Sequence, residues 1–200
     1  MATKDKIDKC MVRFRRALDE IIEKGEIGQE TELSIEQRLT AFRAEHPDFR
    51  GLSFGTIAGY GAHGAIVHYE ADESSNAPLA ARSFLLLDSG AHYISGTTDI
   101  TRTLPLGPLT DEERKVYTLV LKGHIALARA RFPERTQGLV LDFAARYAMW
   151  QEGMDFGHGT GHGVGCHLCV HEGPQQIRKN TNAASTTPFV AGMTITDEPG

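Results

Sequence analysis

The residues best suited to chemistry are concentrated in residues 154–173, which read MDFGHGTGHGVGCHLCVHEG. This stretch holds four of the nine histidines of the chain and six of its 21 glycines. Glycine lets the backbone approach a ligand closely, and imidazole is both the commonest metal ligand and a general acid or base near neutral pH. The composition therefore indicates a functional site. The alternative is a glycine-rich loop with histidines on the surface.

Two aspartates follow apolar segments further toward the N-terminus. Asp88 comes directly after the run FLLL, and Asp99 lies in the next predicted strand. Two converging carboxylates repel each other unless a cation lies between them. The alternative is ordinary local structure, in which Asp88 caps a turn with Ser89-Gly90 and Asp99 pairs with Arg102.

Three histidines and a glutamate complete the candidate set. His158 and His162 flank a Gly-Thr-Gly segment that disfavours a helix, so that one imidazole could bind metal while the other meets substrate. His171 follows nine residues later, and Glu198 lies in the closing DEPG. Two aspartates, one glutamate and one histidine make a hard, oxygen-rich donor set that suits Mn²⁺ better than a closed zinc site. Two such ions can hold a hydroxide that is poised to attack a carbonyl.

The Cys166-His167-Leu168-Cys169 segment has the spacing of a redox or zinc motif. A zinc site needs two more ligands of this kind, and only Cys10 remains. The alternating pattern that runs on through Val170 instead predicts a strand on which both cysteines are packing residues.

The composition is that of an ordinary globular protein, with 40% hydrophobic and 24% charged residues among 200. The length predicts a single domain over residues 1–200. A net charge of −5 provides no basic surface for nucleic acid. No apolar run is long enough to cross a membrane, and the N-terminus lacks the apolar core of a secretory signal. With an odd number of cysteines, these features predict a cytoplasmic protein with neither nucleic acid nor membrane as partner.

Apolar periodicity predicts four helices. The first covers residues 3–24, the second begins at Ser34 with Gln37 in a capping box and ends before Pro47, and the others cover residues 110–131 and 139–151. The apolar stripe of the first helix consists of Ile7, Met11, Phe14, Leu18 and Ile21. Strands are predicted at residues 54–60, 65–69, 82–87, 92–94, 99–104, 165–172 and 193–198. This mixed order predicts an α+β fold.

Four segments, in chain order, closely resemble the catalytic domain of the Xaa-Pro aminopeptidases, or aminopeptidases P. They are GTIAGYGAHGAIVHY, LLLDSGAHYISGTTDITRT, FGHGTGHGVG…VHEGP and GMTITDEPG. The resemblance implies the pita-bread α+β fold of metallopeptidases, an antiparallel sheet covered by helices, which methionine aminopeptidase, prolidase and creatinase share. It implies release of the N-terminal residue from a peptide with proline in second position. Two Mn²⁺ ions are implied, with Zn²⁺ or Co²⁺ as alternatives, and cytosolic members often form homodimers.

The same resemblance assigns a role to each candidate residue. Asp88 would chelate one metal ion, Asp99 would bridge the pair, and His162 and Glu198 would bind the second ion.

The catalytic and substrate-binding roles are also implied by the resemblance. His68 and His158 would line the substrate site, and His171 would contact the scissile carbonyl or the oxyanion formed from it. Glu198 would also carry a proton from the attacking water to the leaving nitrogen. His158, His171 and Glu198 are therefore the catalytic candidates.

The sequence departs from the family pattern in three places. The pattern continues past EPG to a second glutamate that bridges both metals, so we expect the C-terminal part of the domain to be missing here. Many members carry additional domains ahead of the first helix. His63 stands where asparagine is more common.

Two other functions remain open at this stage. A prolidase would cleave Xaa-Pro dipeptides on the same fold, although the GYGAHGAIVHY and HGTGHGVG segments are more similar to the aminopeptidase. A non-catalytic pita-bread module would bind histones or ribosomal partners after losing its metal ligands. Four of the five ligand positions are present, which argues against such a module.

Overall fold

The computed structural model describes residues 2–200, with side chains from Lys9 onward. The chain divides into two compact units, of which the first extends to Thr110 and includes Cys166–Leu168. The second comprises Asp111–Gly165 and Cys169–Gly200. A single domain over residues 1–200 stays a prediction. None of the helices among the described residues has the length and apolar character needed to cross a membrane.

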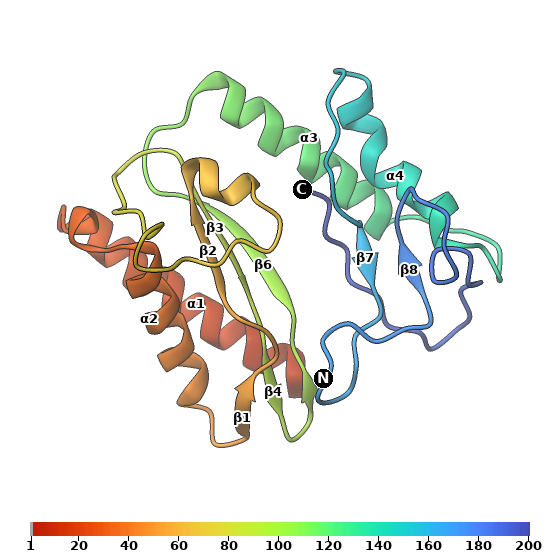
Figure 1. Cartoon of the computed structure of the whole chain (residues 1–200), viewed down its shortest axis with the longest axis horizontal. Coiled ribbons are helices and arrows are strands. Elements are labelled where there is room, and N and C mark those ends of the chain that lie inside the picture. The colour runs from red at the N-terminus through yellow and green to blue at the C-terminus, as the bar shows by residue number, and fades with distance from the viewer. Residues whose placement is uncertain (1) are drawn as a thin grey trace. The chain divides into compact units, whose positions relative to one another are not determined.

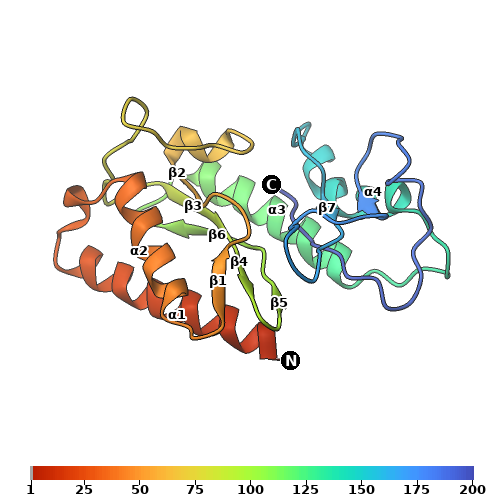
Figure 2. The ribbon, with the colours of Figure 1, turned by 60° about the horizontal axis from the view of Figure 1, so that its bottom comes forward.

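The first unit contains two antiparallel sheets of three strands each (Figures 1 and 2). One has the order β2-β3-β6, from Ile57–Tyr60, Phe84–Ser89 and Ile100–Pro105. The other has the order β1-β4-β5, from Phe49–Leu52, Ala91–Tyr93 and Gly96–Thr97. The central strand β3 pairs with a neighbour on each edge, and its side chains alternate between buried positions, such as Leu85 and Leu87, and half-buried ones. The strands predicted near residues 82–87, 92–94 and 99–104 are thus confirmed.

Two helices supply the apolar core of the first unit, α1 (Ala2–Glu23) and α2 (Glu32–Ala44), with the short η1 (Ile27–Gln29) between them. Figure 2 shows both helices beside β2-β3-β6. The cluster includes Phe14 and Leu18 from α1, Ile35 and Leu39 from α2, and Leu85 and Leu87 from β3. The predicted first helix and its stripe are confirmed, except that the side chain of Ile7 lies outside the described residues.

The second unit is built on two helices that pack against each other, α3 (Asp111–Ala128) and α4 (Gly138–Trp150) (Figure 1). Its one labelled strand pair joins β7 (Gly161–His162) to β8 (Gln176–Ile177) in antiparallel register. The core combines these elements through Leu127, Leu141, Ala145, Ile177 and Phe189. Both helices were predicted near these positions, and together with the antiparallel strands they confirm the α+β class.

The predicted capping box of the second helix is wrong by three residues. The N-cap is Thr31, whose hydroxyl accepts the Ser34 N–H at 3.2 Å, while the Ser34 hydroxyl accepts the Thr31 N–H at 2.8 Å. Because serine itself completes this reciprocal pair, Gln37 is not needed for the cap. The sequence TELS contains a capping box one turn earlier than predicted.

The predicted strand at residues 65–69 is also wrong. Residues Gly61–Ala65 form the short helix η2, and two tight turns follow it. In these turns the Ile66 N–H bonds to the His63 carbonyl, and the Tyr69 N–H bonds to the Ile66 carbonyl, both at 3.1 Å. His68 has φ +56°, in the left-handed region. Apolar residues in this segment therefore follow turns and do not alternate along a strand.

The segment at residues 165–172 forms a loop instead of the predicted strand. The Gly165 N–H bonds to the Cys169 carbonyl at 3.2 Å, and Leu168 has φ +72°, so the chain turns back on itself. Cys166 and Cys169 are exposed. The interpretation of both cysteines as packing residues on a strand is therefore wrong.

The segment at residues 193–198 runs beside β7 but is not a strand. Its backbone N–H groups donate to carbonyls of residues 160 and 162, and among these described residues no backbone bond runs in the opposite direction. Its Thr196 N–H bonds to the His162 carbonyl at 2.9 Å, and its Glu198 N–H bonds to the Thr160 carbonyl at 2.8 Å. The reciprocal bond is missing because the His162 N–H donates to the Thr196 hydroxyl, at 2.9 Å, and not to a carbonyl. The predicted strand at residues 193–198 is therefore wrong, because the segment bonds to residues 160 and 162 without forming a complete ladder.

We predict that Gly123→Ala destabilises the protein although alanine favours helix. A Cβ at Gly123 in α3 would overlap the carbonyl oxygen of Ala145 in α4. Overpacking at such a contact costs about 1–3 kcal/mol, more than the ~1 kcal/mol gained in helix propensity. The free energy of unfolding in urea measures the net loss. The control is Ala126→Gly, on the exposed side of α3. It should lower the free energy of unfolding by about 1 kcal/mol, because it changes helix propensity alone. Stabilisation by Gly123→Ala would contradict the close packing of the helices.

Candidate functional site

The pairing of β7 with its two neighbours brings His162 and Glu198 together. On one side His162 pairs with Gln176 of β8, and on the other the 193–198 segment approaches closely. That approach requires glycine at Gly161, because a Cβ there would overlap the Thr196 carbonyl. The His162 Nε2 atom and the Glu198 Oε1 atom are 3.7 Å apart.

The hydrogen bonding of His162 matches that of a metal ligand. Its Nδ1 atom lies 2.9 Å from the Gly163 carbonyl oxygen, so Nδ1 carries the proton and donates it. In the neutral ring the lone pair is then on Nε2, on the side of the Glu198 carboxylate. A lone pair and a carboxylate oxygen repel each other unless a cation satisfies both, and metal-bound histidines commonly donate their other N–H in this way. The donor atoms therefore fit a divalent cation.

His171 lies against His162 across a backbone turn. The Glu172 N–H bonds to the Gly163 carbonyl at 2.8 Å, which holds the two arms of the turn together. The two imidazole rings are 4.3 Å apart at an interplanar angle of 74°. The second unit thus gathers His162, His171 and Glu198 in one place.

A buried arginine fixes the segment that carries His158. Arg146 is fully buried in α4, and its Nε donates to Asp142 at 2.6 Å, one turn earlier. Its Nη1 donates to the Phe156 carbonyl at 2.6 Å and its Nη2 to the His158 carbonyl at 2.8 Å. The guanidinium also lies 3.7 Å from the centre of the Phe156 ring. The Thr160 hydroxyl donates to the other oxygen of Asp142, so the helix holds both ends of this segment.

Asp155 is a fourth hydrogen-bond partner of Arg146. Its Oδ1 accepts from Arg146 at 2.7 Å. Burial alone would raise the pKa of Asp155, but hydrogen bonds from Lys179 and Arg146 hold that pKa well below its usual range. The sequence analysis missed Arg146, Asp142 and Asp155. The available signal was the Asp-Arg pair four residues apart on a predicted helix.

In the first unit, Asp88 lies in the β2-β3-β6 sheet, and Asp99 directly precedes β6. Asp88 in β3 pairs with Thr101 in β6, and Asp99 precedes Thr101 by two residues. Since side chains alternate along an extended chain, we expect the Asp99 carboxylate on the face that carries Asp88. Arg102 donates to the Thr101 carbonyl at 2.7 Å.

His68 is exposed on the loop after η2 in the first unit. The candidates thus fall in two groups, each placed by its own unit. The first unit presents His68, Asp88 and Asp99, and the second presents His158, His162, His171 and Glu198. Their individual roles stay predictions.

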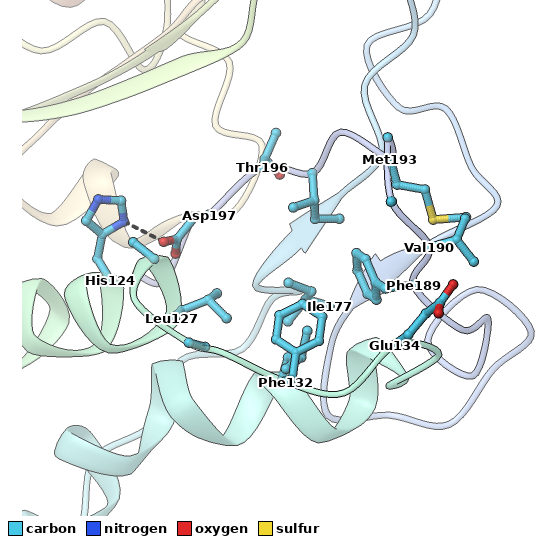
Figure 3. A pocket seen from close by; sticks show the side chains of 16 residues that line it. His124, Leu127, Phe132, Glu134, Ile177, Phe189, Val190, Met193, Thr196 and Asp197 are labelled. Atoms are coloured by element: carbon cyan, nitrogen blue, oxygen red, sulfur yellow. Dashed lines mark ion pairs between the residues drawn. The ribbon is translucent and has the colours of Figure 1, made fainter.

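An apolar hollow of about 840 Å³ lies elsewhere in the second unit (Figure 3). Its lining includes Ile177, Phe189 and, at one end, Asp197. Asp197 Oδ2 is 3.1 Å from His124 Nδ1; burial raises the pKa of Asp197, and the His124 charge opposes that rise. Successive side chains of an extended segment point to opposite sides, so Asp197 faces this hollow while Glu198 faces His162. The hollow's lining contains neither His162 nor Glu198.

A family model and curated sequences match the chain along most of its length. The model for metallopeptidase family M24 matches residues 5–200. Aminopeptidase P1 of Arabidopsis thaliana is 47% identical over 176 residues, which make up 88% of this chain and 27% of that protein. Xaa-Pro aminopeptidase 1 of Dictyostelium discoideum is 47% identical over 182 residues, 91% of this chain and 29% of that protein. The chain therefore spans less than a third of the length of these relatives.

Solved structures resemble the chain to a similar extent. An X-prolyl aminopeptidase from Caenorhabditis elegans, described as a cytosolic enzyme with a di-nuclear active site, matches with a TM-score of 0.85 and 40% identity. The match covers 95% of this chain and 30% of that one. A prolidase from Thermococcus sibiricus matches with a TM-score of 0.80 and 26% identity, covering 98% of this chain and 48% of that one.

We predict that Arg146→Met strongly destabilises the protein. The substitution leaves the buried Asp142 carboxylate without its cation and removes donors from the Phe156 and His158 carbonyls. Breaking a buried ion pair on one side costs about 3–5 kcal/mol, which urea unfolding should detect. Arg129→Met, at an exposed position, is the control and should change stability by less than about 0.5 kcal/mol. Equal stability of the two variants would show that Arg146 does not organise this segment.

Proposed function

The chain belongs to metallopeptidase family M24 and has its pita-bread fold, and from this premise we propose that it carries the catalytic residues of an Xaa-Pro aminopeptidase. Such an enzyme releases the N-terminal residue from peptides with proline in second position. The observation that carries the proposal is the approach of His162 Nε2 to Glu198 Oε1 with Nδ1 bonded to a carbonyl. The 47% sequence identity to aminopeptidases P supports a peptide with proline in second position as the substrate.

We assign the metal ligands as the resemblance implies them. Asp88 would hold one ion, Asp99 would bridge two ions, and His162 and Glu198 would hold the second. The oxygen-rich donor set supports Mn²⁺, although Zn²⁺ and Co²⁺ accept the same ligands. When bound, such a pair of ions supplies Lewis-acid activation of water and of the substrate carbonyl.

The remaining residues act on the substrate and on protons. His68 and His158 would line the binding site for the peptide. His171 would donate a hydrogen bond to the scissile carbonyl oxygen, which gains negative charge as the peptide bond is attacked. Glu198 would accept the proton of the attacking water and deliver it to the proline nitrogen that leaves. The contact of His171 with His162 supports its place beside the reacting carbonyl.

Two alternatives predict different substrates. A prolidase would prefer Xaa-Pro dipeptides, but identity is 26% to the Thermococcus prolidase and 40% to the Caenorhabditis aminopeptidase. A non-catalytic module would bind no metal, and the 3.7 Å approach of His162 Nε2 to Glu198 Oε1 supports a metal site instead.

We also propose a cytoplasmic homodimer, with no nucleic acid or membrane as partner. The location is supported by the cytosolic Caenorhabditis enzyme. For the dimer, α4 presents four exposed apolar side chains at helical spacing, Val140, Phe143, Tyr147 and Trp150. The Phe143 ring lies 5.2 Å from that of Tyr147 and 5.9 Å from that of Trp150. Such a continuous aromatic stripe is typical of a protein interface.

We predict that the protein carrying this sequence cleaves an Xaa-Pro-Xaa tripeptide with added Mn²⁺ and cleaves the matching Xaa-Pro dipeptide more slowly. Asp99→Ala should release bound metal and lower kcat/KM about a thousandfold or more, because several kcal/mol of Lewis-acid stabilisation are lost. Metal content by elemental analysis and product release are measured on the same sample.

The control for that experiment is Asp111→Ala, which removes an exposed carboxylate at the start of α3 and should keep both metal and activity. Full activity of Asp99→Ala would contradict the metal assignment. A preference for the dipeptide would instead identify a prolidase.

We predict that Tyr147→Glu converts the dimer to a monomer, because it places a charge in the middle of an apolar interface. Light scattering coupled to gel filtration gives the mass directly. Arg129→Glu, away from the α4 stripe, should leave the mass unchanged. A wild-type monomer at micromolar concentration would overturn the proposed dimer.

A further inference from the structure

A buried carboxylate in the first unit holds the loop that presents His68. Glu32 is the first residue of α2, and its side chain is fully buried. A buried carboxylate is costly unless hydrogen bonds and charges compensate it. Its position in the first turn of a helix supplies part of that compensation, because the helix dipole is positive there.

The donors that surround this carboxylate come from one loop segment, residues 60–77. Oε1 accepts the Tyr60 N–H at 2.7 Å, and Oε2 accepts the Ala77 N–H at 2.9 Å, so the carboxylate binds both ends of the loop. Oε2 also accepts the Tyr69 hydroxyl at 2.8 Å. His63 Nδ1 lies 2.9 Å from Oε1 and 3.1 Å from Oε2. One side chain therefore fixes the beginning, the middle and the end of the loop.

The loop carries its exposed residues between these anchors. Tyr69 is buried and bound to Glu32, while its neighbour His68 is exposed with φ +56°. Ile66 and Val67, each 52% exposed, precede His68. A histidine with left-handed backbone geometry needs the surrounding structure to hold it, since this conformation is unfavourable for an L-residue. The Tyr69 hydroxyl bond to Glu32, at 2.8 Å, is one such restraint, and the bond from the Tyr69 N–H to the Ile66 carbonyl is another.

We propose that Glu32, together with His63, is a positioning residue that holds the 60–77 loop so that His68 is presented to the peptide substrate. The role of His68 in this inference rests on the proposed function. The role of Glu32 rests on its hydrogen bonds to the loop. Neither Glu32 nor His63 contacts the reacting atoms in this proposal. They act through the loop.

The substitution Glu32→Gln tests the carboxylate with little change of shape. The amide that replaces the carboxylate has one oxygen, so either of its orientations places an NH₂ group against two of the loop donors. Losing hydrogen bonds to a charged group should raise KM for the tripeptide about tenfold, with a smaller change in kcat. Bound Mn²⁺ should not change. Glu45→Gln at the other end of α2, where the ion pair with Arg13 is exposed, is the matched control.

A second pair of variants tests His63 with a smaller risk to folding. In His63→Asn the amide nitrogen takes the place of Nδ1 and can still donate to Glu32, so KM should stay within about twofold. His63→Leu removes the donor, and we expect KM to rise about fivefold. If Glu32→Gln does not fold, this pair and Tyr69→Phe decide the proposal.

A double-mutant cycle separates positioning from general stability. If Glu32 acts through His68, then Glu32→Gln should change kcat/KM less than about twofold in a His68→Ala background. Hydrogen exchange should show faster exchange of the loop amides in Glu32→Gln, with β3 and β6 unchanged. Unchanged loop exchange, unchanged kinetics, or additive effects in the cycle would each overturn the proposal. If the wild-type protein fails to cleave the tripeptide, the proposed function fails by itself, and loop exchange still decides whether Glu32 holds the loop.

Discussion

The ion pair between Arg146 and Asp142 is the interaction on which the path of residues 156–160 in the second unit depends. One guanidinium on α4 satisfies a carboxylate of its own helix and the carbonyls of Phe156 and His158. A glycine-rich segment has few side chains with which to pack, so apolar burial cannot fix its path. A buried guanidinium can fix the path of such a segment. Its several N–H groups donate to backbone carbonyls that have no strand partner.

In the first unit, a buried negative charge, Glu32, holds an irregular loop in place. Glu32 accepts from the backbone N–H groups and side chains of an irregular loop, as Arg146 donates to carbonyls. In each case the charged side chain comes from an α-helix and bonds to a neighbouring segment that is largely irregular, residues 60–77 for Glu32 and residues 155–158 for Arg146. This division follows from hydrogen bonding, since regular elements satisfy their own backbone groups and loops do not. The helices are therefore the rigid part of both sites.

The sequence predicts the helices well and the loops poorly, for the same physical reason. Phe14 and Leu18 recur at helical spacing because one face of α1 is buried, and that spacing is visible in the sequence. In residues 65–69, the apolar residues after a glycine-rich turn favour a strand, but Tyr69 turns inward to reach Glu32, 37 residues away. In residues 165–172, the Gly165–Cys169 bond reverses the chain. Contacts of this kind depend on distant residues or on left-handed φ values that no local pattern records.

The candidate site was found by residue type, but its geometry depends on details that composition does not contain. His162 and Glu198 stand out as a histidine and a carboxylate near glycines. Their approach to 3.7 Å requires that Gly161 admit the neighbouring segment and that the Thr196 hydroxyl accept the His162 N–H. The Gly163 carbonyl then fixes the tautomer, so that the lone pair is on the nitrogen nearer Glu198. Gly161, Gly163 and Thr196 thus determine how the candidate ligands are presented, because they set backbone distance and proton position.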